Sequence, residues 1–354
     1  MLWQYTFRYF CQMKSLFNKC FPFLLGILLF AACKDDTSPV TDHASNNPIF
    51  KEDATLKSLT EEIAKAPSQA SLYFERGRTL HKMKLDTLAL KDYKKAATLD
   101  SSKAEYFSAV GDLLFENKDI TGSIEWIQKA ISLKPDDRKA HLKIAKLFLY
   151  LQDYPRAFAE INLVLVKNVY DPEAYFLKGM IYKDMKDTAR AISTFETAVQ
   201  VAPDYREAVV QLGILHSAKG DAIAMKYLDN AYAMDTTDVF PIFARGVFYQ
   251  EMKDYQKAKN EYRKCILRNR RYTDAYFNMG YILLQEDSTQ KAWRQYDLAI
   301  KTDPSNPFAY YNRGLCSEIM DSLANAVADY RTAQRLDTSY ANPREALKRL
   351  VKQK

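Results

Sequence analysis

Histidine is scarce in this chain, and the motifs of catalytic sites are missing. Four histidines occur among 354 residues, and no two are four positions apart, so the histidine pair of a helical zinc site is absent. There is also no Gly-x-x-x-x-Gly-Lys phosphate loop, no Gly-x-Ser-x-Gly nucleophile elbow and no Cys-x-x-Cys pair. We therefore expect no enzymatic activity, no metal site and no cofactor.

Charge of one sign is not strongly in excess. The chain holds 51 basic and 44 acidic residues, a net charge of +7. A nucleic-acid-binding protein usually presents a clustered basic face, and no run looks dense enough for one. We expect no nucleic-acid partner, and we interpret the basic stretch from Lys348 to Lys354 as a solvated helix face.

Glycine is also scarce, but seven of the ten glycines recur at a fixed interval. The steps between successive positions are 34 residues, with a single step of 33, and Ala145 fills the one gap. A period of 34 indicates helix–turn–helix units that bury their apolar faces against their neighbours. The seven regularly spaced glycines are Gly77, Gly111, Gly179, Gly213, Gly246, Gly280 and Gly314.

Other columns follow the same period. With each glycine counted as position 8, position 20 is small and position 24 is large in every unit, as in Ala258 and Tyr262. Small residues at positions 8 and 20 allow two antiparallel helices to approach closely, and the large residue at position 24 fills the space beyond. An aspartate or serine near position 16, such as Asp119 or Ser288, is expected to cap the second helix of each unit.

The pattern resembles the tetratricopeptide repeat. The clearest match is the seventh unit, with Ala275-Tyr276-Phe277-Asn278-Met279-Gly280 followed by Ala292, Tyr296, Ala299 and Pro304. The resemblance implies an all-α, right-handed superhelical solenoid. We place eight units at 70–103, 104–137, 138–171, 172–205, 206–238, 239–272, 273–306 and 307–340, with capping helices in 53–69 and 341–354.

The N-terminal 52 residues read as a targeting segment and a tether. Residues 1–32 fit a signal peptide and not a membrane span, because the apolar run is shorter than the roughly 20 residues that span a bilayer. A complete signal peptide begins at Met13, so we expect Met13 to be the true start. Leu29-Phe30-Ala31-Ala32-Cys33 resembles a bacterial lipobox, which implies fatty acyl chains such as palmitate on Cys33. Lys34-Asp35-Asp36 resembles the surface-export signal of Bacteroidetes lipoproteins. We expect an outer-membrane lipoprotein, surface-exposed or facing the periplasm, with a flexible tether over 33–52.

Two cysteines remain in the repeat region. Cys265 and Cys316 lie in units six and eight, too far apart for a disulfide, which needs α-carbons within about 7 Å. We expect two buried, unpaired thiols.

The resemblance also suggests a binding surface. In this family the first helix of each unit lines the groove, and the corresponding residues are polar in units one to three but mainly apolar in units six to eight. We call the latter set the partner row and predict that it binds a peptide or protein. Alternatively, its aromatic residues pack between units or against the terminal helix. The partner row comprises Phe240, Phe243, Val247, Phe277, Asn278, Tyr281, Leu284, Phe308, Tyr311, Asn312 and Leu315.

These features predict a non-catalytic scaffold, anchored by lipid to the outer membrane, that acts as an adaptor in an envelope complex. The alternative is a glycan- or peptidoglycan-binding lipoprotein whose row aromatics stack on sugars. The first predicts co-purification with envelope proteins, and the second predicts retention on cell-wall material.

Overall fold

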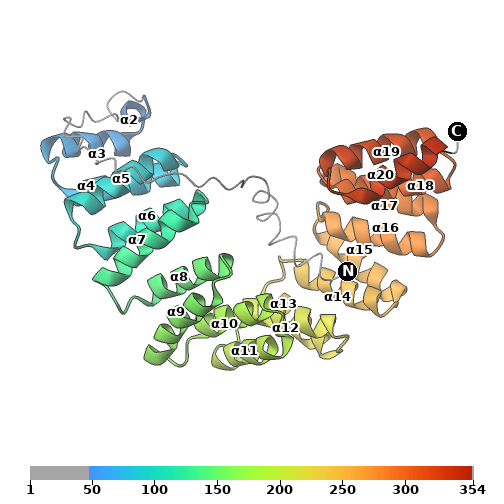
Figure 1. Cartoon of the computed structure of the whole chain (residues 1–354), viewed down its shortest axis with the longest axis horizontal. Coiled ribbons are helices and arrows are strands. Elements are labelled where there is room, and N and C mark those ends of the chain that lie inside the picture. Colours follow the sequence, from blue (N-terminus) through green and yellow to red (C-terminus); the bar gives the residue numbers. More distant parts are fainter. Residues whose placement is uncertain (1–47, 353–354) are drawn as a thin grey trace, which may run out of the picture. The chain divides into compact units, whose positions relative to one another are not determined.

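The computed structural model describes residues 48–352, with side chains to Leu350, and this part of the chain holds 19 helices and no strand (Figure 1). The predicted all-α fold is confirmed. The first helices of the units are α4 (Ala70–Lys82), α6 (Ala104–Glu116), α8 (Arg138–Tyr150), α10 (Pro172–Asp184), α12 (Arg206–Ala218), α14 (Phe240–Glu251), α16 (Thr273–Gln285) and α18 (Pro307–Ile319). The second helices are α5 (Asp86–Leu99), α7 (Ile120–Leu133), α9 (Tyr154–Lys167), α11 (Thr188–Val201), α13 (Ile223–Met234), α15 (Tyr255–Arg268), α17 (Thr289–Thr302) and α19 (Leu323–Leu336).

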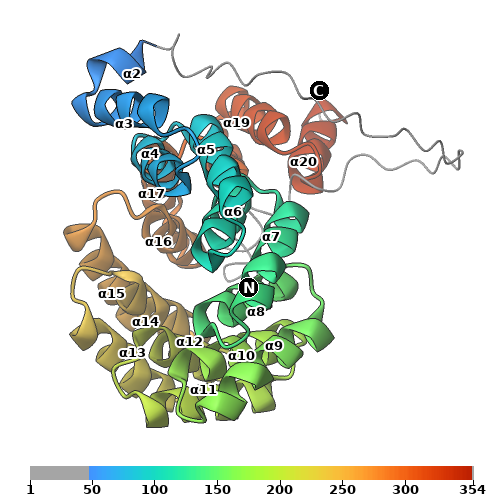
Figure 2. The ribbon, with the colours of Figure 1, turned by 90° about the vertical axis from the view of Figure 1, so that its left-hand side faces the viewer.

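Helices pack in pairs, and the pairs pack on their neighbours. In seven of the eight units the first helix contacts the second helix of its own unit, as α18 with α19, and the pair of α4 and α5 can be followed in both views (Figures 1 and 2). The second helix then contacts the first helix of the following unit, as α5 with α6 and α17 with α18. The contacts divide the described chain into an N-terminal body (48–194) and a C-terminal body (195–352).

The regularly spaced glycines lie where two helices touch. A methyl group added to Gly246 would lie 2.5 Å from the Cε1 of Tyr262, which is fully buried at position 24 of the same unit. The same short approach occurs in units one, two, five, seven and eight. In unit three, Ala145 and Ile161 are both buried. The predicted packing of a small residue at position 8 against a large residue at position 24 is therefore seen within these units.

The turn within each unit contains a residue in the left-handed region. Gly220 has a φ of 69°, but seven other units place a side chain at the same position, with φ between 54° and 66°. These seven residues are Lys84, Lys118, Gln152, Lys186, Lys253, Asp287 and Asp321. The following residue lies just before the second helix. In all eight units its backbone amide donates to the carbonyl oxygen five positions back, as Asp254 N to Tyr249 O at 2.9 Å.

The predicted caps are confirmed in part. Asp119, Asp153 and Asp254 each accept a hydrogen bond from a backbone amide in the first turn of the second helix, at 2.9, 3.2 and 3.2 Å. The prediction is wrong for Asp86, which is the first residue of α5 and contacts the His81 ring instead. It is also wrong for Ser288, which precedes α17 without a side-chain cap.

Both ends of the repeat array are covered by helices. At the N-terminal end α3 (Ala54–Lys65) buries Leu56 and Ile63, and at the C-terminal end α20 (Ala341–Lys352) buries Ala346 and Leu350. The tether predicted over 33–52 is wrong at its C-terminal end. There α2 (Ile49–Glu52) forms a short helix with Phe50 only 4% exposed, because its ring packs in the core formed with Leu56 and Leu80.

Candidate functional site

The partner row comes from three first helices of the C-terminal body, α14, α16 and α18. Three of its members are buried rather than accessible: Phe243 is 4% exposed, Val247 5% and Asn278 3%. The Phe243 ring packs on Tyr262 and Tyr272, with centroids 5.6 and 5.2 Å apart. A contact with a partner is therefore excluded for these three side chains in this conformation.

The two row asparagines are occupied within the protein. The Nδ2 of Asn278 donates to the Tyr262 hydroxyl at 3.2 Å. The Nδ2 of Asn312 donates to the carbonyl oxygen of Phe308, one turn earlier in α18, at 2.8 Å. Neither amide is presented for the backbone of a bound peptide, so the role that the resemblance implied for them is not seen here.

Phe240 of the row is half-buried and packs against the cluster that includes Tyr262. Three further row aromatics are half-buried and held by other rings. Phe277 packs edge-on against Tyr296, with centroids 5.5 Å apart. Tyr311 packs on Tyr330 and Tyr340 at 5.5 and 5.4 Å, and Phe308 packs on Tyr340 at 4.8 Å. These ring pairs lie within single units. Phe277 also packs against clusters that include Ala309 and Cys316 of unit eight, and Tyr311 packs against the cluster that includes Ala346 and Leu350 of α20, as the alternative interpretation predicted. Phe277, Phe308 and Tyr311 each remain partly exposed to solvent.

The accessible part of the row is therefore narrower than predicted. Tyr281, Leu284 and Leu315 are half-buried. The Tyr281 ring packs on no other ring of the described residues. Burial raises the pKa of the Tyr281 hydroxyl, with a smaller effect from Tyr255 and Glu251 nearby. These three residues lie on the first helices α16 and α18. Their exposed area is apolar apart from the Tyr281 hydroxyl.

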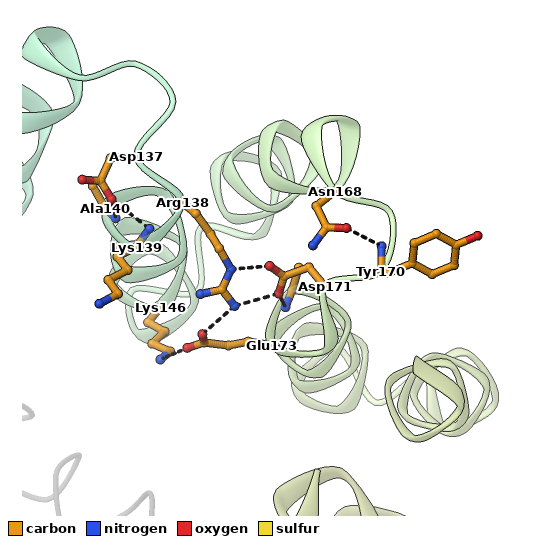
Figure 3. A network of polar contacts seen from close by, with 10 residues as sticks. Asp137, Arg138, Lys139, Ala140, Lys146, Asn168, Tyr170, Asp171 and Glu173 are labelled. Atoms are coloured by element: carbon orange, nitrogen blue, oxygen red, sulfur yellow. Dashed lines mark hydrogen bonds and ion pairs between the residues drawn. The ribbon is translucent and has the colours of Figure 1, made fainter. Parts of the chain in front are cut away.

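First helices of the N-terminal body carry charges that are paired with each other. In Figure 3, Arg138 at the start of α8 reaches the carboxylate of Asp171, with Nη2 to Oδ1 at 2.9 Å, and Glu173, with Nη2 to Oε2 at 3.0 Å. Lys146 donates to the other oxygen of Glu173 at 2.8 Å. Asp171 also caps α10 by accepting from the Ala174 amide at 2.9 Å. These charges join units three and four and leave little for an external ion.

Several other charged first-helix residues are also paired. Arg78 pairs with Glu75 at 3.0 Å, Lys143 pairs with Asp112, and the His81 ring lies between Asp86 at 2.9 Å and Glu116 at 3.7 Å. On these first helices of the N-terminal body, many basic side chains therefore lie next to an acidic one.

A set of arginines at position 7 was missed by the sequence analysis. Arg313 binds Asp329 of its own unit with two hydrogen bonds of 2.7 and 2.9 Å and Asp297 of the preceding unit at 2.6 Å. Arg245 likewise binds Glu261 and Asp229. The signal was available for these two, because Arg245 and Arg313 each have an acidic residue 16 positions before and 16 positions after them.

The first of these arginines shows where the N-terminal cap belongs. Arg76 binds Asp92 through two hydrogen bonds of 2.7 and 2.9 Å, and its Nη1 reaches the Thr60 hydroxyl at 3.3 Å. Thr60 lies in α3 exactly 16 residues before Arg76, the place that Asp297 takes before Arg313. The α3 helix therefore contacts unit one as the second helix of a preceding unit would.

The cysteines behave as predicted in the repeat region. Cys265 and Cys316 are both buried and unpaired. Burial raises the pKa of each thiol to about 12, so neither is a reactive thiolate at neutral pH.

The predicted signal peptide, Cys33 and most of the tether precede residue 48 and lie outside the described residues. Within 48–352, no helix has the length and apolar character needed to cross a bilayer. In the same part of the chain, no group of three or more histidine, cysteine or acidic side chains is arranged to hold a metal ion.

Comparison with known families bears on five of the eight units. The tetratricopeptide repeat family model matches five segments, 70–103, 104–137, 172–205, 242–272 and 309–340. The first three are the same residues as three of the units defined by the glycine spacing. The chain is a tetratricopeptide-repeat protein.

Known relatives of this repeat protein are distant. Stress-induced-phosphoprotein 1 of Caenorhabditis elegans is 22% identical over 245 residues, which cover 65% of this chain and 72% of the relative. The BBSome complex member BBS4 of Bos taurus is 22% identical over 284 residues, 70% of this chain but only 54% of the relative. The chain thus spans about half the length of the second relative.

A solved structure agrees on the fold. The crystal structure of a tetratricopeptide repeat protein from Parabacteroides merdae superposes with a TM-score of 0.55 at 13% identity, covering 70% of this chain and 98% of that chain. At this identity the likeness concerns the fold alone. Repeats of this family are generally scaffolds for protein–protein contacts rather than catalysts.

Proposed function

We propose that this repeat protein is a non-catalytic scaffold that binds a protein or peptide partner through the accessible part of the partner row. The observation that carries the proposal is the array of stacked repeats with Tyr281, Leu284 and Leu315 partly open on its first helices. Tyr281 and Leu284 pack against buried core clusters, so little free energy would be lost in ordering these two side chains on binding.

Binding by this surface would be mainly apolar. Each side chain can lose its remaining water-exposed area on contact, and apolar area removed from water contributes roughly 25 cal/mol per Å². The Tyr281 hydroxyl would add one hydrogen bond and thereby orientation. The charged first helices of units three and four would add less, because their ion pairs are already made within the protein.

A lipid anchor at Cys33 would place the scaffold on the outer membrane, either on the cell surface or facing the periplasm. Support comes from the lipobox-like string before Cys33 and from the Lys34-Asp35-Asp36 string after it. Two or more acyl chains hold a protein stably on a bilayer. Phe50 would mark where the chain leaves the membrane tether and joins the folded array.

Co-purification tests the binding proposal. The triple variant Tyr281→Ala, Leu284→Ser and Leu315→Ser is compared with wild type by affinity capture from crosslinked cells and mass spectrometry. A control variant, Leu298→Ser with Leu336→Ser, removes leucines that are 37% and 40% exposed on second helices. Loss of envelope proteins from the triple variant alone supports the scaffold. Equal capture by all three proteins, or capture of cell-wall glycan alone, contradicts it.

The anchor is tested separately. Cells grown with an alkyne-tagged fatty acid should label the wild-type chain, whereas Cys33→Ser should lose the label and leave the membrane fraction. A Cys20→Ser control should keep both, because residue 20 precedes the proposed cleavage site. Label on Cys33→Ser, or membrane association without label, would contradict a lipid anchor at this cysteine.

A further inference from the structure

The second helix of unit six carries a concentration of positive charge that the sequence analysis missed. Between Lys253 and Arg271 there are eight basic residues and two acidic ones. This segment comprises α15 and the loop that follows it. We call its exposed side chains the α15 face.

Some of these charges are compensated within the protein. Lys257 pairs with Asp254 at 2.8 Å and Lys264 pairs with Glu261 at 2.6 Å, both on α15 or its cap. Lys259 reaches Glu286 of the next unit at 2.7 Å. The lysines of the segment are thus partly neutralised.

The arginines are not compensated in the same way. Arg263, Arg268, Arg270 and Arg271 are exposed, and none forms an ion pair with a carboxylate of residues 48–352. Arg263 donates only to the neutral side chain of Asn260, at 3.1 Å, and Arg268 donates to the Tyr232 hydroxyl at 2.8 Å. Four guanidinium groups within nine residues therefore keep most of their donors directed to solvent.

An apolar residue and a hollow lie among these charges. Leu267, between Arg263 and Arg268, is 74% exposed, which makes it one of the most exposed large apolar side chains of the described chain. A surface cavity of about 380 Å³ is lined by Leu267, Tyr249, Lys257, Asn260, Glu261, Arg263 and Lys264. The carboxylate of Glu261 is paired with Lys264 and Arg245. Lys257 lies over the Tyr249 ring at 5.3 Å and forms one wall.

We propose that the α15 face binds an acidic polypeptide segment that carries a single apolar residue among its carboxylates. A guanidinium group binds a carboxylate with two parallel hydrogen bonds, which favours arginine over lysine at such sites. The apolar residue would enter the cavity against Leu267 and Tyr249. The face shares no residue with the partner row, so this inference does not depend on the function proposed above.

A polypeptide fits this face better than a nucleic acid or a membrane. The carboxylates of Asp254 and Glu261 lie within the basic segment, and a continuous row of phosphates would be repelled by them. A polypeptide can pass these positions with neutral side chains. The cavity also favours an inserted side chain over a flat lipid surface.

The test uses the full chain purified in detergent and a fluorescein-labelled synthetic peptide with one leucine flanked by glutamates. Binding is measured by fluorescence anisotropy. Arg263→Glu with Arg270→Glu should weaken binding at least about tenfold, since each arginine would lose a charge-assisted contact. Arg331→Glu with Arg335→Glu makes the same change of charge on exposed residues of α19 and should stay within about twofold of wild type.

The apolar contact is tested with Leu267→Ser and with a peptide in which serine replaces leucine. Each change alone should weaken peptide binding several-fold. The two changes together should weaken it little more than either change alone, because both remove the same contact. Circular dichroism of every variant should match wild type.

Three results would overturn the proposal. One is an equal loss of peptide affinity in the α15 and α19 charge reversals, which would reflect net charge alone. Another is an unchanged peptide affinity in Arg263→Glu with Arg270→Glu. The third is a reversal that abolishes binding only to a single-stranded DNA oligonucleotide, or to phosphatidylcholine vesicles containing phosphatidylglycerol. The partner-row triple variant should bind the peptide as wild type does, which separates this inference from the proposed scaffold function.

Discussion

The side chain of Asn278 in α16 donates a hydrogen bond to the hydroxyl of Tyr262 in α15, at 3.2 Å, across the junction of units six and seven. The Tyr262 hydroxyl in turn donates to the Oε1 of Gln250 in α14 at 2.9 Å. All three side chains are at least nine-tenths buried. An asparagine placed in the partner row by its position in the repeat is thus part of the joint between two units.

Asn278→Ala should therefore act on stability and not on partner capture. Removing a buried hydrogen-bond partner costs about 1–3 kcal/mol. Urea unfolding followed by circular dichroism should show the loss, whereas affinity capture from crosslinked cells should return the same proteins as wild type. Asn260→Ala, an exposed asparagine on α15, should leave the free energy of unfolding within about 0.5 kcal/mol. Loss of capture in a folded Asn278→Ala protein would return this residue to the binding site.

Gly246→Ala should destabilise the junction of α14 and α15. The added methyl group would lie 2.5 Å from a carbon of the buried Tyr262 ring, so ring or backbone must shift, at a cost of about 1–3 kcal/mol. Better helix propensity offsets up to about 1 kcal/mol of this. In a double-mutant cycle, Gly246→Ala should cost less in a Tyr262→Leu background than in the wild-type protein, because the smaller side chain removes the clash. A Gly246→Ala protein more stable than wild type would show that the helix pair is not limited by this contact.

Breaking the buried pair of Arg76 and Asp92 should be costly. Their side chains are 3% and 9% exposed, and Arg76→Met would leave the Asp92 carboxylate without its cation, which costs about 3–5 kcal/mol in buried pairs. Arg76→Met with Asp92→Leu should be distinctly more stable than Arg76→Met alone, because no charge remains buried. Equal stability of the single and double variants, measured by urea unfolding, would contradict this account of the pair.

His141 should make the N-terminal body less stable at alkaline pH. Its ring is 5% exposed, with Nδ1 at 2.6 Å from Glu160 and Nε2 at 2.8 Å from the Pro135 carbonyl oxygen, so both ring nitrogens face acceptors. Burial lowers the pKa of His141, but these two hydrogen bonds and the charges of Glu160 and Asp137 outweigh it, and the net shift is upward.

A raised pKa in the folded protein stabilises the fold below the ordinary histidine pKa, and this stability is lost as the pH rises through the folded value. The free energy of unfolding should therefore fall as the pH rises above about 6.5, the ordinary histidine pKa. His141→Gln should lack this part of the pH dependence, whereas His43→Gln, which precedes the described residues, should keep it. An NMR titration showing the His141 ring neutral at pH 6 would refute the prediction.

Periodicity revealed the helix pairs because it rests on contacts within one unit. The spacing of Gly246 and Tyr262 places a small and a large residue on facing helices, and the same rule holds along the chain. The burial of Phe243 and Asn278 could not be read in this way, because it depends on Tyr262 and Tyr272, which come from other positions of the repeat. Periodicity assigns a residue to a helix face. How much of that face stays open depends on the rings packed around it, from the same unit for Phe243 and from the preceding unit for Asn278.

The features missed by the sequence analysis have different physical reasons. The charge of the α15 face was visible as a run from Lys253 to Arg271, but the net charge of the whole chain concealed it. The helix at Ile49–Glu52 carries too few residues for a periodic pattern. Only the core around Leu80 shows why Phe50 is held there.

The most direct test of the scaffold is site-specific photocrosslinking in living cells. A photoreactive phenylalanine analogue at residue 281 should crosslink to a distinct envelope protein, because this position lies in the accessible part of the partner row. The same analogue at residue 336, on the solvent side of α19, should give no such product. If residue 281 yields no crosslinked protein, or if both positions yield the same products, the partner row does not bind a partner and the central claim fails.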